Sequence, residues 1–199
     1  MKRFVVGISG ASGIILAYKT IRALAGQGHN IELVVSKAAL YAASLELEED
    51  LSSPDSFIKS LPADIQEKIS LHRISDVGCA IASGSFPTDG MIIIPCSMAT
   101  VAAISYGIAD NALRRAADVT LKEERQLILV PRECPFSQLH LENLLRLSKL
   151  GATIIPPLPA WYTRPKTVSD IEDFIVGKVL DALKIPHTLY PRWGLSCKE

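Results

Sequence analysis

The 199-residue sequence has no excess of charge of either sign, because its 21 Lys and Arg residues are balanced by 21 Asp and Glu residues. A neutral chain lacks the basic surplus with which nucleic-acid-binding and membrane-surface proteins attract phosphates. The sequence also has no C-x-x-C pair among its four cysteines, which are Cys79, Cys96, Cys134 and Cys197. Zinc centres, iron–sulfur centres and a disulfide framework are therefore not expected, and scattered cysteines fit a reducing cytoplasm.

Long uncharged runs are scarce as well. Residues 91–109 are 19 residues without a charged side chain, which is close to the length of a membrane span. A proline, a glycine and several hydroxyl side chains interrupt this run, so we expect a buried strand, a turn and a buried helix instead. The length of the chain predicts one domain over residues 1–185, followed by a C-terminal tail over residues 186–199.

The sequence does contain a regular alternation of apolar runs and helical segments. The apolar runs predict buried strands at residues 4–8, 31–35, 91–94, 127–130 and 152–155. The helical patterns occupy residues 14–25, 37–47, 98–105, 111–124, 136–150 and 168–183. Residues 50–90 are less regular, with short helices separated by prolines and a short strand at 72–74. This order predicts an α/β fold whose parallel sheet carries helices on both faces and binds ligands at the carboxyl ends of its strands.

The first strand ends in a glycine-rich turn formed around Gly7, Gly10 and Gly13. Glycines let the backbone approach a ligand, and the N–H groups at the start of a helix attract phosphate. The spacing is G-x-x-G-x-x-G and not the dinucleotide pattern G-x-G-x-x-G, and the second strand ends in Ser36 and Lys37 without an acid for a ribose hydroxyl. The turn therefore favours a mononucleotide over NAD, although a tight turn without a ligand has the same glycines.

Later strand ends carry further polar residues. Ser97 and Thr100 are placed to cap the next helix and also to bind phosphate oxygens. Cys96 has no activating base nearby in the sequence, so we expect it to be a small buried residue and not a nucleophile.

A charged helix and two more turns carry the remaining candidate ligand-binding and catalytic residues. Arg115, Asp118 and Lys122 share one helix face, which leaves spare positive charge for an anion or forms an ordinary salt-bridged surface. Arg132 and Glu133 follow a buried strand, where they are placed to bind phosphate and move protons or to form a structural ion pair. After the last strand, the Trp161–Tyr162 pair on a proline-stiffened loop suits an apolar substrate wall.

Taken together, these stretches resemble the UbiX family of flavin prenyltransferases over almost the full length of the chain and in the family's order. The matching pieces are GISGASG at 7–13, VVSKAA at 34–39, ASGSF at 82–86, PCSMAT at 95–100, RRAADVTLKEER at 114–125, PREC at 131–134, HLENLLRLSKLGATIIPPLPAWY at 140–162 and PRW at 191–193.

The resemblance implies an FMN-binding, single-domain Rossmann-like (flavodoxin-like) fold that assembles as a homo-oligomer, usually a dodecamer, in the cytoplasm. In the family, dimethylallyl monophosphate alkylates reduced FMN at N5, and a second bond to C6 closes a ring. The prenylated FMN then serves a UbiD-type decarboxylase, often in ubiquinone biosynthesis. No metal is required.

The resemblance also implies roles for individual residues. The FMN contacts carried over by motif are Gly10, Ala11, Ser12, Ser36, Ser97, Met98, Ala99, Thr100 and Arg132. The residues implied to hold the prenyl phosphate are Arg115, Lys122, Arg132, Tyr162 and Lys178. Glu133 is implied to transfer protons, with Ser12 and Lys122 as the other catalytic residues. Such cations suit a leaving phosphate, and a dry pocket suits an allylic cation.

This chain departs from the family pattern at two positions. Lys178 replaces the usual Arg, which keeps the charge and loses the bidentate fork, and Trp161 replaces the usual Phe. A flavin-dependent cysteine decarboxylase shares the expected fold, but its P-A-S-A-N-T motif has an Asn that PCSMAT lacks, and no His lies in the first helix. Decarboxylase activity, an older description of the UbiX family, and a flavodoxin-like electron carrier are the remaining alternatives. The length of the prenyl group and the choice between mono- and diphosphate stay open.

Overall fold

The computed structural model describes residues 1–47 and 53–194, so Cys197 and the end of the expected tail lie outside the described residues. Within them a six-stranded sheet has the order β3-β2-β1-β4-β5-β6, and every neighbouring pair is parallel. Its strands are β1 (Arg3–Ile8), β2 (Asn30–Val35), β3 (Ile69–His72), β4 (Gly90–Cys96), β5 (Leu127–Pro131) and β6 (Thr153–Ile154). The predicted α/β class and the parallel sheet are confirmed.

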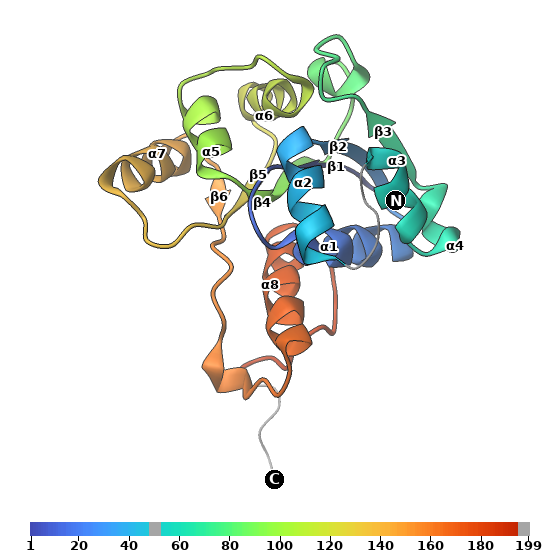
Figure 1. The fold of residues 1–199 in the computed structure, drawn as a ribbon, viewed down its shortest axis with the longest axis vertical. Coiled ribbons are helices and arrows are strands. Elements are labelled where there is room, and N and C mark those ends of the chain that lie inside the picture. The colour runs from blue at the N-terminus through green and yellow to red at the C-terminus, as the bar shows by residue number, and fades with distance from the viewer. Residues whose placement is uncertain (48–52, 195–199) are drawn as a thin grey trace.

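Helices connect the strands and cover the sheet (Figure 1). They are α1 (Ile14–Gly26), α2 (Lys37–Glu46), α3 (Pro54–Ser60), α4 (Ala63–Gln66), α5 (Met98–Ser105), α6 (Ala112–Lys122), α7 (Gln138–Lys149) and α8 (Val168–Ala182), with short 3-10 helices η1 (Ala80–Ala82) and η2 (Trp161–Thr163). Residues 91–109 form a strand, a turn and a helix as expected, and no helix among the described residues is long and apolar enough to cross a membrane.

One predicted strand is misplaced. The sequence suggested a strand at residues 72–74, whereas the chain pairs with β2 through Ile69–His72 and leaves the sheet after His72. Ile74 has a different role, because its carbonyl accepts a hydrogen bond from the Ala112 N–H at 2.9 Å at the start of α6. The residues of β3 are only partly buried at the edge of the sheet. The sequence therefore has no apolar run there that would mark where the strand begins and ends.

Each face of the sheet has its own apolar core. Alternate residues of the central strands, such as Val6 and Ile92, pack with α1 and α8 on one face. Their neighbours, such as Val5 and Ile93, pack with α5, α6 and α7 on the other face. Every residue of β4 is buried. Because both faces are covered, the strands appear in the sequence as unbroken apolar runs.

The order of the strands reverses between β1 and β4. From β1 the chain builds outward through β2 to β3, then crosses back to β4 and builds outward on the other side. Ser9, which is 2% exposed, bridges the two strands just beyond their ends. Its hydroxyl accepts a hydrogen bond from the Ser97 N–H at 2.8 Å and donates one to the Pro95 carbonyl at 3.2 Å. Open parallel sheets bind ligands at such a reversal.

Gly10 lies too close to α2 to carry a side chain. A Cβ at Gly10 would lie 2.3 Å from the Ala38 Cβ. We therefore expect Gly10→Ala to lower the free energy of unfolding of the protein by about 1–3 kcal/mol, the usual cost of overpacking. Urea unfolding followed by circular dichroism measures this.

Two further variants separate crowding from a general effect of the added methyl group. Ala38→Gly in the Gly10→Ala background removes the clash and should recover part of the loss, because contacting residues couple. Gly26→Ala is the matched control, since a Cβ there meets nothing within 4 Å. An unfolding midpoint for Gly10→Ala equal to that of Gly26→Ala would contradict the close approach.

Candidate functional site

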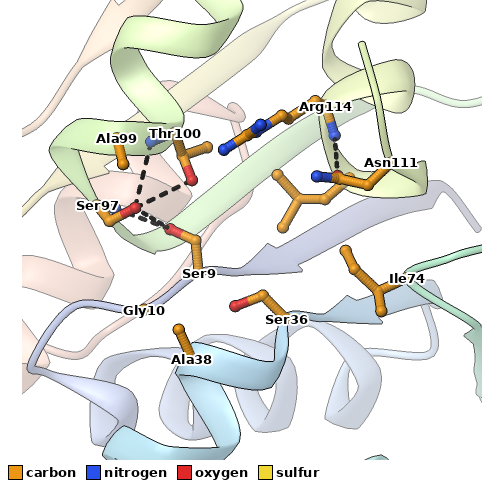
Figure 2. A pocket seen from close by; sticks show the side chains of 11 residues that line it. Ser9, Gly10, Ser36, Ala38, Ile74, Ser97, Ala99, Thr100, Asn111 and Arg114 are labelled. Atoms are coloured by element: carbon orange, nitrogen blue, oxygen red, sulfur yellow. Dashed lines mark hydrogen bonds between the residues drawn. The ribbon is translucent and has the colours of Figure 1, made fainter. Parts of the chain in front are cut away.

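A cavity of about 250 Å³ opens at the reversal between β1 and β4 (Figure 2). It is bounded by the turns that follow β1, β2 and β4 and by the first turn of α6. Its lining residues are Ser9, Gly10, Ser36, Ala38, Ile74, Ser97, Ala99, Thr100, Asn111, Leu113 and Arg114. The lining combines hydroxyl groups, small side chains and one guanidinium, and it includes no carboxylate among the described residues.

Three helices begin at this cavity, and each has a capping residue in its lining. Ser36 caps α2 by accepting from the Ala39 N–H at 3.1 Å, and Ser97 caps α5 by accepting from the Thr100 N–H at 3.3 Å. Asn111 caps α6 by accepting from the Arg114 N–H at 3.0 Å. The first turn of a helix has N–H groups without intrahelical partners and a partial positive charge. The starts of the three helices favour an anion in the cavity.

The start of α1 differs from these three. The Glu46 carboxylate, at the end of α2, accepts from the Gly13 N–H at 2.9 and 3.1 Å and from the Ile14 N–H at 2.9 Å. A carboxylate thus occupies the N–H groups that the glycine-rich turn was expected to offer to phosphate. Sequence reasoning missed Glu46, because only the packing of α2 on α1 brings it to this position.

The structure brings together part of the predicted FMN set. Gly10, Ser36, Ser97, Ala99 and Thr100 line the cavity, whereas Ala11, Ser12, Met98 and Arg132 do not. Met98 is packed in the core at 7% exposure, and Ser12 is exposed. Sequence reasoning did not assign a role to Ser9, Ala38, Ile74, Asn111, Leu113 or Arg114. The N-cap position of Asn111, just before a helical pattern, was a signal that could have identified it.

The residues expected to hold the prenyl phosphate do not line the cavity. Arg115 pairs with Asp118 at 2.8 Å on α6, and Lys122 pairs with Glu123 at 2.7 Å. Tyr162 lies on η2. Figure 1 places η2 and α6 at opposite ends of the molecule along its longest axis, so these groups cannot meet within one chain.

Tyr162 and Lys178 lie where the C-terminal residues pack back on α8. The ring of Tyr162 makes edge contacts with Trp193 and Phe174, at 5.1 and 6.2 Å between centroids. Lys178 Nζ lies 3.7 Å from the Asp181 carboxylate.

Asp181 is the centre of the contacts that hold this segment. It accepts hydrogen bonds from His187, Tyr190 and Arg192. Partial burial by itself would raise the pKa of Asp181, but the hydrogen bonds from Arg192, Tyr190 and His187 outweigh it and hold the pKa well below its usual range. Asp181 is therefore an anion that fixes the chain around Tyr162 and Lys178.

Arg132 and Glu133 follow β5 directly. The Arg132 N–H donates to the Cys96 carbonyl at 3.2 Å, which ties this turn to the end of β4. The half-buried Glu133 accepts from the N–H of Cys134 at 3.1 Å. The two side chains form no ion pair with each other within the described part of the chain, so the structural ion pair considered from the sequence is wrong.

Cys96 is fully buried, as expected from the sequence. Burial raises the pKa of its thiol to about 12, in spite of a hydrogen bond from Ser9 that lowers it. A thiol that stays protonated at neutral pH is not an effective nucleophile.

A model of the family described as Flavoprotein matches residues 1–180 of this chain. The cavity between β1 and β4 lies where such a fold binds its ligand, which agrees with the family match. The chain is therefore a flavoprotein.

Comparison of the sequence and of the fold with known proteins identifies more specific relatives. The chain is 52% identical over 194 residues to the flavin prenyltransferase UbiX of Chlamydia pneumoniae, with 98% of each protein covered. A dodecameric FMN-dependent UbiX-like decarboxylase from Escherichia coli has a TM-score of 0.85 at 42% identity, covering 96% of this chain and 98% of that one. AnUbiX, solved with FMN and dimethylallyl pyrophosphate, has a TM-score of 0.87 at 38% identity, covering 97% of each chain. This chain belongs to the UbiX family of flavin prenyltransferases.

Proposed function

We propose that this protein transfers a dimethylallyl group from dimethylallyl monophosphate to reduced FMN. The observation that carries the proposal is the cavity at which α2, α5 and α6 all begin, with Ser36, Ser97 and Asn111 in its lining. The donor set fits a phosphorylated flavin, because helix N-termini and hydroxyl groups bind phosphate while small side chains leave room for a chain and ring. The volume of about 250 Å³ is below the usual 300–1,000 Å³ of ligand pockets, so one chain encloses only part of an FMN-sized ligand.

The chemistry assigns two tasks to side chains. When bound, reduced FMN supplies the nucleophilic N5 and C6 atoms. Transfer breaks the bond between the prenyl carbon and the phosphate oxygen, so negative charge grows on the phosphate. Cations stabilise that charge, and we assign this role to Arg115, Lys122, Arg132 and Lys178 with the Tyr162 hydroxyl, while Ser12 contributes a hydroxyl at the exposed start of α1. Closing the ring would convert the prenyl C=C bond into a bond to C6, so that one alkene carbon gains a proton and C6 loses one, and we assign Glu133 as the acceptor of the proton from C6.

A single chain does not assemble these groups, so we propose that the working site is composite. Arg115 and Lys122 lie on α6, at the other end of the molecule from Tyr162 on η2 (Figure 1). Contact between copies of the chain is the arrangement that lets both sets serve one flavin. The Escherichia coli relative is dodecameric, and we propose the same assembly here.

We further infer that the product leaves for a UbiD-type decarboxylase in the cytoplasm, with ubiquinone biosynthesis as one such setting. Decarboxylation by this chain itself is the competing activity, since the Escherichia coli relative is described as a decarboxylase.

One experiment separates these activities. The protein is incubated anaerobically with chemically reduced FMN and dimethylallyl monophosphate, and the released flavin is analysed by mass spectrometry. We expect a flavin heavier than FMN by one five-carbon prenyl unit, together with one equivalent of inorganic phosphate. Dimethylallyl diphosphate in a parallel reaction tests the leaving group. Unmodified FMN, together with carbon dioxide release from a peptide with a C-terminal cysteine, would overturn the proposal in favour of a decarboxylase.

Glu133→Gln should retain FMN binding and lose most of the turnover. The amide keeps the shape and hydrogen bonds of the side chain but cannot accept a proton, and general acid–base groups contribute roughly 10²–10⁴-fold in rate. Single-turnover measurements at saturating dimethylallyl monophosphate provide the rate. If Glu133 only helped to hold the substrate, the variant would need more prenyl phosphate yet reach the wild-type rate at saturation.

The α7 apolar face, defined as Leu141 and Leu145, should contribute to assembly. These two leucines lie one helical turn apart and are 54% and 56% exposed on the periphery of the fold (Figure 1), and exposed apolar patches mark interfaces. We expect Leu145→Glu to reduce the mass measured by light scattering, because a carboxylate would be buried between copies. Lys59→Glu, on the exposed side of α3, is the control. A wild-type mass of one chain, or an undiminished assembly in Leu145→Glu, would contradict this role.

A further inference from the structure

Arg114 is the charged side chain at the cavity. It begins in the first turn of α6, and Figure 2 shows its guanidinium extending over the cavity toward Thr100 on α5. Its side chain is 23% exposed. It is the neighbour in sequence of Arg115, yet the two have separate surroundings, because Arg115 pairs with Asp118 and does not line the cavity.

Asp110 holds the Arg114 guanidinium in place but accepts hydrogen bonds from only one of its nitrogens. Arg114 Nη1 donates to both carboxylate oxygens of Asp110, at 2.8 and 3.0 Å. Among the described residues, Nη2 and Nε of Arg114 make no hydrogen bond. An Arg fork binds a phosphate through two parallel N–H groups, so Arg114 retains donors for a second anion while Asp110, which is 58% exposed, fixes its orientation.

The charges around the cavity favour an anion. The lining has the Arg114 guanidinium and three helix N-termini and no carboxylate among the described residues, and Asp110, outside the lining, pairs with Arg114 through Nη1 alone. A phosphate monoester has a charge between −1.5 and −2 at neutral pH. FMN differs from riboflavin by this one group, so the cation is placed to distinguish the two flavins.

We propose that Arg114 is a specificity-determining residue that selects the phosphorylated flavin by binding its phosphate. This inference rests on the proposed function only in requiring that the flavin enter this cavity. It does not depend on prenyl transfer, and binding can therefore test it independently of catalysis.

The test compares two flavins on the full-length protein freed of bound flavin. Oxidised FMN and riboflavin are titrated by calorimetry at one fixed ionic strength. We expect Arg114→Gln to weaken FMN binding by roughly 10- to 100-fold, as for the loss of one or two charge-assisted hydrogen bonds, and to leave riboflavin binding nearly unchanged. The FMN affinity of Arg114→Lys should lie between those of the wild type and Arg114→Gln, because Lys keeps the charge and loses the two parallel N–H donors.

Arg22→Gln removes the same charge from the exposed surface of α1 and is the matched control. Circular dichroism verifies the fold of each variant, and if Arg114→Gln does not fold, Arg114→Lys carries the comparison. Equal losses for FMN and riboflavin, or an unchanged affinity for FMN, would overturn the inference. An effect confined to the dimethylallyl monophosphate requirement would also overturn it, because Arg114 would then hold the prenyl phosphate.

Failure of the proposed function would look different. The wild-type protein would then bind FMN more tightly than riboflavin through Arg114 and still form no prenylated flavin. A wild-type protein that binds neither flavin would overturn both.

Discussion

The hydroxyl of Ser9 joins the two strands between which the whole site opens. By accepting from the Ser97 N–H and donating to the Pro95 carbonyl, it holds the end of β1 against the end of β4. The position of Ser97 then fixes the start of α5, and the chain after β1 places Gly10 against Ala38 at the start of α2. A buried hydroxyl with both partners satisfied costs little, whereas its removal leaves the Ser97 N–H without this partner, while the Pro95 carbonyl keeps the Ser9 backbone N–H. This contact helps to place the starts of α2 and α5 at one cavity.

Much of the fold could be predicted because strands and helices that are buried show a recognisable pattern of apolar residues in the sequence. Strands such as β4, buried on both faces, appear as unbroken apolar runs, and α5 begins and ends at the expected residues. Sequence reasoning failed where tertiary contacts decide. The edge strand β3 lies earlier than expected, and Glu46 reaches the start of α1 only because α2 packs beside it. Arg114 was overlooked for the same reason, since nothing local shows that α6 begins at the cavity of β1 and β4, whereas the N-cap position of Asn111 was a usable local signal.

The distribution of charge explains how a neutral chain can handle phosphates. In one chain two of the candidate phosphate-binding cations are already paired, Arg115 with Asp118 and Lys122 with Glu123. Exposed pairs of this kind contribute little to stability, so a phosphate can compete for the cations at small cost. The cavity itself uses helix N-termini and one guanidinium, which add local positive charge without a net excess. A neutral composition is thus compatible with a locally positive cavity.

The central claim is that the flavin phosphate lies where α2, α5 and α6 begin. A crystal structure of the protein with FMN tests it most directly. The account predicts phosphate oxygens within hydrogen-bond distance of the Ser36, Ser97 or Thr100 side chains and of first-turn N–H groups. An ordered FMN whose phosphate lies elsewhere, for example beside Tyr162 and Lys178, would contradict it.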